Sequence, residues 1–136
     1  MTEVRSKGHE PRALVVEDDR GTRQLLEALL REQGCTVDSV SDGEQAIACL
    51  DLHDYRVVLL DIVLPKKSGT DIMEHLRETN PGQLNRVIVV TGLNVDEIRK
   101  LFPAVCQALS KPVMPSRLLS AVTLCLGRGH EQITSV

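Results

Sequence analysis

The sequence predicts an α/β domain in which a five-stranded parallel sheet is covered by helices. Short apolar, β-branched runs alternate along the chain with segments of helical periodicity, which is the pattern of repeated βαβ units. The expected strands are residues 13–17, 36–40, 57–61, 87–91 and, more weakly, 108–110. A chain of 136 residues is long enough for one hydrophobic core, so we expect a single domain.

The segments after the first two runs carry helix signals. Leucines recur at helical spacing over residues 25–30, and Gly34 supplies a stop signal before the second strand. The turn pair Asp42-Gly43 precedes a second expected helix over residues 44–52.

The later helices have their own start and stop signals. Ser68 and Asn94, each with an acidic residue three positions on, resemble capping boxes for a third and a fourth helix. Asn80-Pro81-Gly82 is expected to end the third helix, and Pro103 predicts that the fourth is short. The fifth helix is expected to run from Pro115 to Gly127 along an apolar stripe, Leu118, Leu119, Val122 and Leu126.

Composition narrows the class of protein. The formal net charge is -3 with both signs dispersed, so the chain offers no basic field for nucleic-acid phosphates and we expect no direct nucleic-acid partner. No apolar run approaches the roughly 18 residues of a membrane helix, so we expect a cytoplasmic protein without membrane insertion.

The four cysteines form no Cys-x-x-Cys pair, which argues against a zinc site. The polar ends, residues 1–11 and 128–136, are expected to be flexible tails.

Acidic residues follow the two most apolar runs. "ALVV" leads into Glu17, Asp18 and Asp19, and "VVLL" leads into Asp61. Such runs are typical of central strands buried on both faces. If these strands are neighbours, their acids converge at the carboxyl edge, where open α/β sheets bind ligands. Crowded carboxylates repel, and a hard divalent cation such as Mg²⁺ resolves that repulsion. Acids at this position could alternatively cap a helix.

Two further polar residues are expected at the same edge. Thr91 ends the fourth run, and Lys111 follows the fifth. A cation, an ammonium and a hydroxyl around one carboxylate would suit an anion whose charge must be neutralised, as phosphoryl transfer requires. Asp61 would then be the nucleophile.

Five motifs in this order resemble one family. "LVVEDD", "VVLLDIVLP" followed by "SG", "VIVVTG" and "LSKPV" are similar to the receiver domain of bacterial two-component response regulators, and the resemblance covers residues 12–127. It implies a doubly wound, flavodoxin-like receiver fold with strand order 2-1-3-4-5 and five helices. It also implies a signalling phosphoprotein of a two-component or phosphorelay pathway, and not a turnover enzyme.

The resemblance assigns roles to the acids. Asp61 is similar to the phospho-accepting aspartate, which receives its phosphoryl group from a histidine kinase or a histidine phosphotransfer protein. Asp18 resembles a direct Mg²⁺ ligand, Glu17 a ligand acting through water, and Val63 the residue whose backbone carbonyl contacts the metal. The expected output is altered binding to a downstream protein.

The resemblance also covers the phosphoryl side of the site. Thr91 is similar to the switch hydroxyl and Lys111 to the pairing lysine, whose peptide bond to Pro112 is expected to be cis. Family members flank the phosphoryl group with two residues that can orient water; here these are Val63 and Leu93, which predicts a long-lived phosphorylated state.

One position departs from the family. Members usually carry Tyr or Phe three residues before the lysine, and that ring moves with the threonine. This sequence has Ala108, which cannot make that movement. The alternative is therefore a receiver-like docking module whose output does not depend on phosphorylation.

Overall fold

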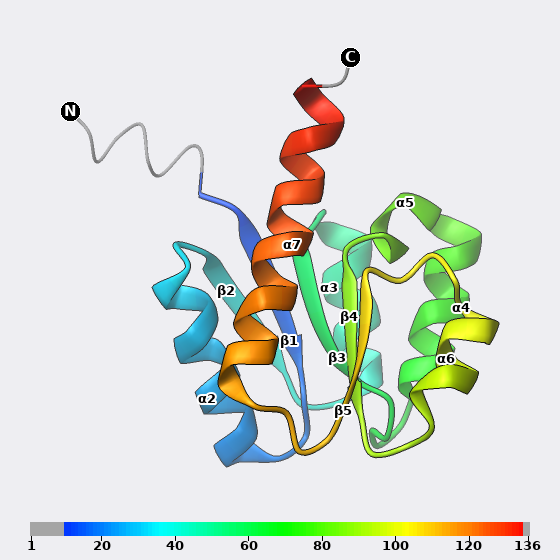
Figure 1. Ribbon diagram of the computed structural model, residues 1–136. Coiled ribbons are helices and arrows are strands. Elements are labelled where there is room, and N and C mark those ends of the chain that lie inside the picture. The colour runs from blue at the N-terminus through cyan, green and yellow to red at the C-terminus, as the bar shows by residue number, and fades with distance from the viewer. Residues whose placement is uncertain (1–9, 135–136) are drawn as a thin grey trace.

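The computed structural model of the protein describes residues 10–134, and side chains up to residue 127 (Figure 1). Five strands form one sheet. They are β1 (Arg12–Val16), β2 (Thr36–Val40), β3 (Val57–Asp61), β4 (Val87–Thr91) and β5 (Gln107–Ser110). Three of them have the expected bounds, β1 is shifted by one residue, and β5 begins one residue early.

The strands lie in the order β2-β1-β3-β4-β5, and every neighbouring pair is parallel. The predicted α/β class and strand order are confirmed. β3 and β4 are buried at every position, as their continuous apolar runs predict for strands covered on both faces. The carboxyl ends of β1 and β3 are therefore adjacent in the middle of the sheet.

Six helices lie between or after the strands in the described part of the chain. They are α2 (Arg20–Glu32), α3 (Gly43–Leu52), α4 (Gly69–Thr79), α5 (Pro81–Leu84), α6 (Val95–Leu101) and α7 (Pro115–Thr134). Five correspond to the expected helices, and α5 is a four-residue turn that the sequence analysis missed. Asn80 ends α4 as expected, but Pro81 then begins a new helical turn, because proline suits the first position of a helix.

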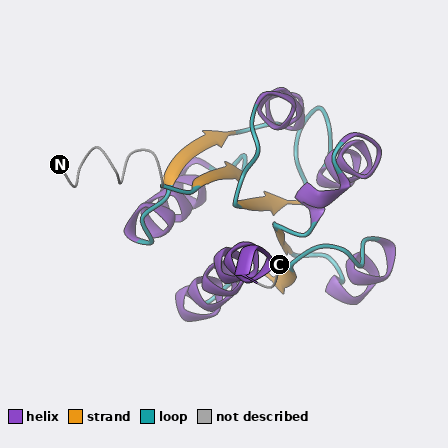
Figure 2. Ribbon diagram, turned by 90° about the horizontal axis from the view of Figure 1, so that it is seen from above, coloured by secondary structure: helices purple, strands orange, loops and turns teal. Residues whose placement is uncertain are grey.

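The helices form two layers, one on each face of the sheet (Figure 2). One face carries α2 and α7, and its core includes Leu30 and Val122. The opposite face carries α3, α4 and α6, and its core includes Ile72 and Ile98. Side chains alternate between these two cores along each strand, which is the period of two that a strand imposes.

Side-chain caps fix where several helices begin. Ser68 accepts the N–H of Asp71 while the Asp71 carboxylate accepts the N–H of Ser68, so the predicted capping box at α4 is present. Asn94 caps α6, which ends after seven residues just before Pro103, as expected. These caps set the directions in which the loops leave the carboxyl edge.

The fifth long helix is longer than predicted. α7 continues through Gly127 to Thr134 and rises past the sheet (Figure 1), so the expectation that Gly127 closes it was wrong. A single glycine costs a helix only about 1 kcal/mol, and the buried Leu118 and Val122 anchor the preceding turns. Of the expected tails, residues 128–134 belong to this helix, and residues 1–9 and 135–136 lie outside the described part.

Gly127→Ala is expected to stabilise the protein by about 0.5–1 kcal/mol, because alanine restricts the unfolded chain and favours the helix. A Cβ atom at residue 127 would meet no heavy atom within 4 Å. Urea unfolding followed by circular dichroism measures the change. Gly34→Ala is the opposite control, since the φ of 87° at Gly34 disfavours a side chain. Destabilisation by Gly127→Ala would contradict a continuous helix there.

Candidate functional site

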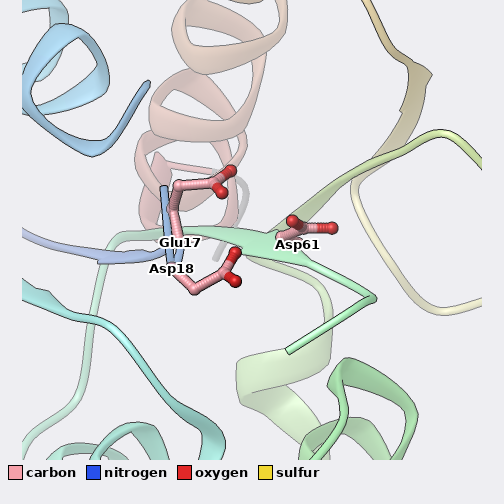
Figure 3. Close-up of side chains that lie close together, drawn as sticks. All are labelled: Glu17, Asp18 and Asp61. Carbon is pink, nitrogen blue, oxygen red and sulfur yellow. The ribbon is translucent and has the colours of Figure 1, made fainter. Parts of the chain in front are cut away.

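Three carboxylates meet at the carboxyl edge of the sheet. β1 and β3 pair in register with Val16 opposite Leu60, so the residues that follow, Glu17 and Asp61, lie side by side. One carboxylate oxygen from each of Glu17, Asp18 and Asp61 lies within 4.8 Å of the others (Figure 3). The predicted convergence of acids from two separate strands is present.

Glu17 is the most enclosed of these acids. Only 2% of its surface is exposed, and its Oε2 accepts the backbone N–H of Asp19 at 3.1 Å. Burial raises the pKa of Glu17, and the nearby charge of Asp61 adds to this, whereas the Asp19 hydrogen bond and Lys111 act in the opposite direction without cancelling it. A carboxylate of this kind is stabilised by a nearby cation.

Asp19, the third acid of the run, has a different role. Its Oδ2 accepts the N–H of Thr22 at 2.8 Å and the Thr22 hydroxyl at 2.7 Å. These two bonds lower the pKa of Asp19 and cap α2. The helix-cap interpretation is therefore correct for Asp19, while Glu17 and Asp18 are left to face Asp61.

Lys111 reaches the acids from the end of β5. Its Nζ lies 3.0 Å from Oδ2 of Asp61 and 3.3 Å from Oε1 of Glu17. Burial alone would lower the pKa of Lys111, but its hydrogen bonds and attraction to Asp61 and Glu17 outweigh burial and raise it. The lysine therefore stays charged beside the carboxylates. Its peptide bond to Pro112 is cis, as expected.

Asp61 is held at both of its oxygens. Oδ2 faces Lys111, and Oδ1 accepts the backbone N–H of Val63 at 3.1 Å. The residue is only 6% exposed. An acid at the end of an apolar strand is thus held by a lysine that follows β5 and by a backbone N–H of its own following loop.

Thr91 lies at the end of β4, the strand next to β3. It is fully buried, and its hydroxyl oxygen accepts the N–H of Leu93 at 3.0 Å. The N–H of Lys111 donates to the Thr91 carbonyl at 2.8 Å. Thr91 and Lys111 are therefore linked through their backbones at the same edge of the sheet.

The two positions predicted to set the phosphoryl lifetime follow β3 and β4 at this edge of the sheet. Val63 is 62% exposed and Leu93 is 52% exposed, and the backbone N–H of each donates to a site side chain, Asp61 and Thr91 respectively. Ala108, the position without an aromatic ring, is buried in β5.

The donor set suits a hard divalent cation. Carboxylate oxygens are the ligands that Mg²⁺ prefers, and it retains several waters where the protein supplies few donors. Asp18 is exposed, and within the described residues its carboxylate has no protein hydrogen-bond partner, so it is free to ligate. Glu17 and Asp61 add two negative charges on the buried side. The site therefore fits Mg²⁺ without rearrangement of the strands.

One contact to the loop after Asp61 was missed by sequence reasoning. The sequence signals assign no contact to Lys66, but its Nζ lies 3.6 Å from Oδ2 of Asp42 and 3.9 Å from Oε1 of Glu44. The sequence signal was the Asp42-Gly43 turn, which was used only as a helix start. Nothing local in the sequence shows that this turn meets a loop some twenty residues later.

Comparison with known proteins identifies the family. The sequence matches the response regulator receiver domain model over residues 13–123, most of the chain. The chain belongs to the response regulator receiver domain family. The family resemblance of the five motifs is confirmed. Among the described residues, no helix of this receiver domain has the length and apolarity needed to cross a membrane.

Curated relatives are longer proteins. The receiver domain is 36% identical over 119 residues to the transcriptional regulatory protein CpxR of Klebsiella pneumoniae, covering 86% of this chain and 50% of that protein. It is 34% identical over 118 residues to the transcriptional regulatory protein TcrA of Mycobacterium tuberculosis, covering 87% and 47%. The chain thus spans about half the length of these relatives.

Solved structures of receiver domains have the same fold. The receiver domain of a LuxO repressor protein from Vibrio parahaemolyticus superposes with a TM-score of 0.80 at 25% identity, covering 93% of this chain and 97% of that one. The receiver domain of the sensor histidine kinase PA1611 from Pseudomonas aeruginosa gives 0.75 at 28% identity, covering 87% and 98%, and was determined with magnesium coordinated in its active-site cleft.

Proposed function

We propose that this receiver domain accepts a phosphoryl group on Asp61, with Mg²⁺ bound by Asp18, Asp61 and the backbone carbonyl of Val63 and with Glu17 acting through water. The observation that carries the proposal is the contact of Asp61 with Lys111 and Val63 inside a cluster of acids. A cluster that served only folding would not need three mutually repelling carboxylates at one strand edge.

The proposed reaction transfers a phosphoryl group from a histidine nitrogen of the donor to the Asp61 carboxylate. An oxygen of the Asp61 carboxylate attacks phosphorus, the bond between phosphorus and the donor histidine nitrogen breaks, and that nitrogen keeps the electron pair. In this reaction Lys111 would neutralise charge on the phosphoryl oxygens, and the Thr91 hydroxyl would donate a hydrogen bond to one of them. When bound, Mg²⁺ adds positive charge beside those oxygens.

The proposed partners follow from this chemistry. The donor is a histidine kinase or a histidine phosphotransfer protein, and the output is altered binding to a downstream protein. We carry over no DNA-binding role, because the relatives named as transcriptional regulators are about twice as long as the matched region. The domain promotes its own phosphorylation and slow dephosphorylation, and is a signalling protein.

A second candidate function is a docking module whose output does not depend on phosphorylation. The observation that favours it is Ala108, which is buried in β5 where the resemblance calls for a mobile ring. The presence of Glu17, Asp18, Asp61, Thr91 and Lys111 together favours the first function, because docking alone does not require this set.

The experiment that tests the proposal is phosphorylation by acetyl phosphate in the presence of Mg²⁺. Wild type is expected to gain one phosphoryl group that is stable in acid and labile in base, as an acyl phosphate should be, and mass spectrometry detects it. Asp61→Asn is expected to gain none. The same mass increase in Asp61→Asn would show that another residue is the nucleophile. No increase in wild type would favour the docking module.

A further inference from the structure

The loop that follows Asp61, residues 62–68, is fastened to the turn between β2 and α3. The backbone N–H of Gly43 donates to the carbonyl of Pro65 at 3.3 Å. Lys66 pairs with Asp42 and Glu44 on the same turn. Asp42 is buried, and its Oδ1 also accepts the N–H of Gln45, which caps α3. The loop therefore contacts a turn that is itself held by a helix-cap hydrogen bond.

Residue 43 must be glycine because a side chain would not fit there, and not because of its backbone conformation. A Cβ atom at residue 43 would overlap the carbonyl oxygen of Lys67. Real structures do not contain such an approach, so any side chain at residue 43 must displace the loop or the start of α3. Backbone clashes of this kind are not relieved by rotating a side chain.

Lys66 adopts a backbone conformation that needs support. Its φ of 67° lies in the left-handed region, which costs a residue other than glycine about 1–2 kcal/mol. The ion pairs of its largely exposed side chain with Asp42 and Glu44 offset at most about 1 kcal/mol of that cost. Together with the hydrogen bond between Gly43 and Pro65, they favour this conformation of the loop.

The other end of the loop is also fixed. The N–H of Gly69 donates to the carbonyl of Ile62 at 2.8 Å, and a Cβ atom at residue 69 would lie 2.8 Å from the carbonyl oxygen of Asp61. Between the two fastened ends lies Val63, whose N–H contacts Asp61. The position of the Val63 backbone is therefore set by contacts on both sides of it.

We infer that Asp42 and Gly43 are positioning residues for the site. By holding residues 65–67, they keep the Val63 backbone beside Asp61, and with it both the N–H that fixes Oδ1 and the carbonyl assigned to the metal. They touch neither the metal nor the phosphoryl group themselves. The inference rests on the proposed function, and extends the site to a turn that follows the edge strand β2.

Gly43→Ala tests the inference, with Mn²⁺ as a paramagnetic probe whose binding is titrated by electron paramagnetic resonance. The apparent dissociation constant for Mn²⁺ is expected to rise about tenfold, as is typical when residues that orient metal ligands are changed. Val122→Ala is the control for lost stability, because Val122 is buried on the opposite face of the sheet. It is expected to lower stability without changing Mn²⁺ affinity.

Lys66→Gly tests the same loop without a steric clash, since glycine adopts a positive φ freely. It removes both ion pairs and is expected to weaken Mn²⁺ binding by a few-fold in a protein that folds. If both Gly43→Ala and Lys66→Gly bind Mn²⁺ with wild-type affinity, the inference is overturned, while the proposed function still stands. An equal loss in Val122→Ala would also overturn it, by making the effect one of stability. No Mn²⁺ binding by wild type would overturn the proposed function itself.

Discussion

Asp18→Ala is expected to abolish Mg²⁺-dependent phosphorylation of Asp61 while the fold stays intact. Asp18 is the exposed member of the acidic cluster, and among the described side chains it has no protein hydrogen-bond partner to lose. Its removal should therefore cost little stability but take away the proposed direct metal ligand. Because the proposed Mg²⁺ site has few protein ligands, the loss of one should reduce the rate by at least about a hundredfold.

The measurement is the rate of phosphoryl incorporation from acetyl phosphate at several Mg²⁺ concentrations. Asp19→Ala is the matched control, because it removes the neighbouring acid with the same change of charge. That variant should lose about 1 kcal/mol of stability with the α2 cap, but it should keep its dependence on Mg²⁺. An unchanged Mg²⁺ dependence in Asp18→Ala would remove the metal role of this residue.

The pair Asp18 and Asp19 also shows how far the sequence could predict the site. Both are acids after an apolar strand, and both could cap the helix that follows. Their roles separate only in three dimensions, where Asp19 turns to Thr22 and Asp18 faces Asp61. The apolar run before these acids was enough to predict the strand. It did not show which carboxylate contacts which partner.

The strand pattern was predictable because it is local. β-branched runs and the turn residues between them predict the bounds of β2, β3 and β4. Leucines that recur at helical spacing predict α2. The end of α7 was not predictable in this way, because a glycine is tolerated once the helix is anchored by Leu118 and Val122. The stop signal at Gly127 was therefore outweighed by packing.

The loop contacts were beyond sequence reasoning for a different reason. Gly43 and Lys67 are far apart along the chain. Gly43 belongs to a turn that predicts a helix start, and Lys67 follows Lys66 in a loop, so neither residue carries a local signal for the other. Their contact depends on β2 and β3 flanking β1. Only the assembled sheet brings the two turns together at the carboxyl edge, so close that glycine is the one residue that fits.

The second large effect concerns the lifetime of the phosphorylated state, which is expected to be long for the family. Loss of the phosphoryl group needs a water in line with the scissile bond, and a polar side chain near it can orient that water. Val63 and Leu93 offer none. Their backbone N–H groups donate to Asp61 and Thr91, so we expect their apolar side chains to flank the proposed phosphoryl position.

Val63→Asn combined with Leu93→Glu is therefore expected to speed hydrolysis by about tenfold or more, since positioned proton acceptors contribute at least that much. Both native side chains are more than half exposed, so the double variant should fold as the wild type does. The decay of phosphorylated protein, freed of acetyl phosphate and followed by mass spectrometry, gives the rate.

Leu52→Asn is the control for adding a polar side chain elsewhere, because Leu52 is exposed at the end of α3 and is expected to leave the decay rate unchanged. Phosphorylation itself should proceed in the double variant, since Asp61, Asp18 and Lys111 are retained. Decay that is equal to or slower than that of wild type would show that the apolar side chains at residues 63 and 93 do not limit the access of water, and that the lifetime is set elsewhere in the domain.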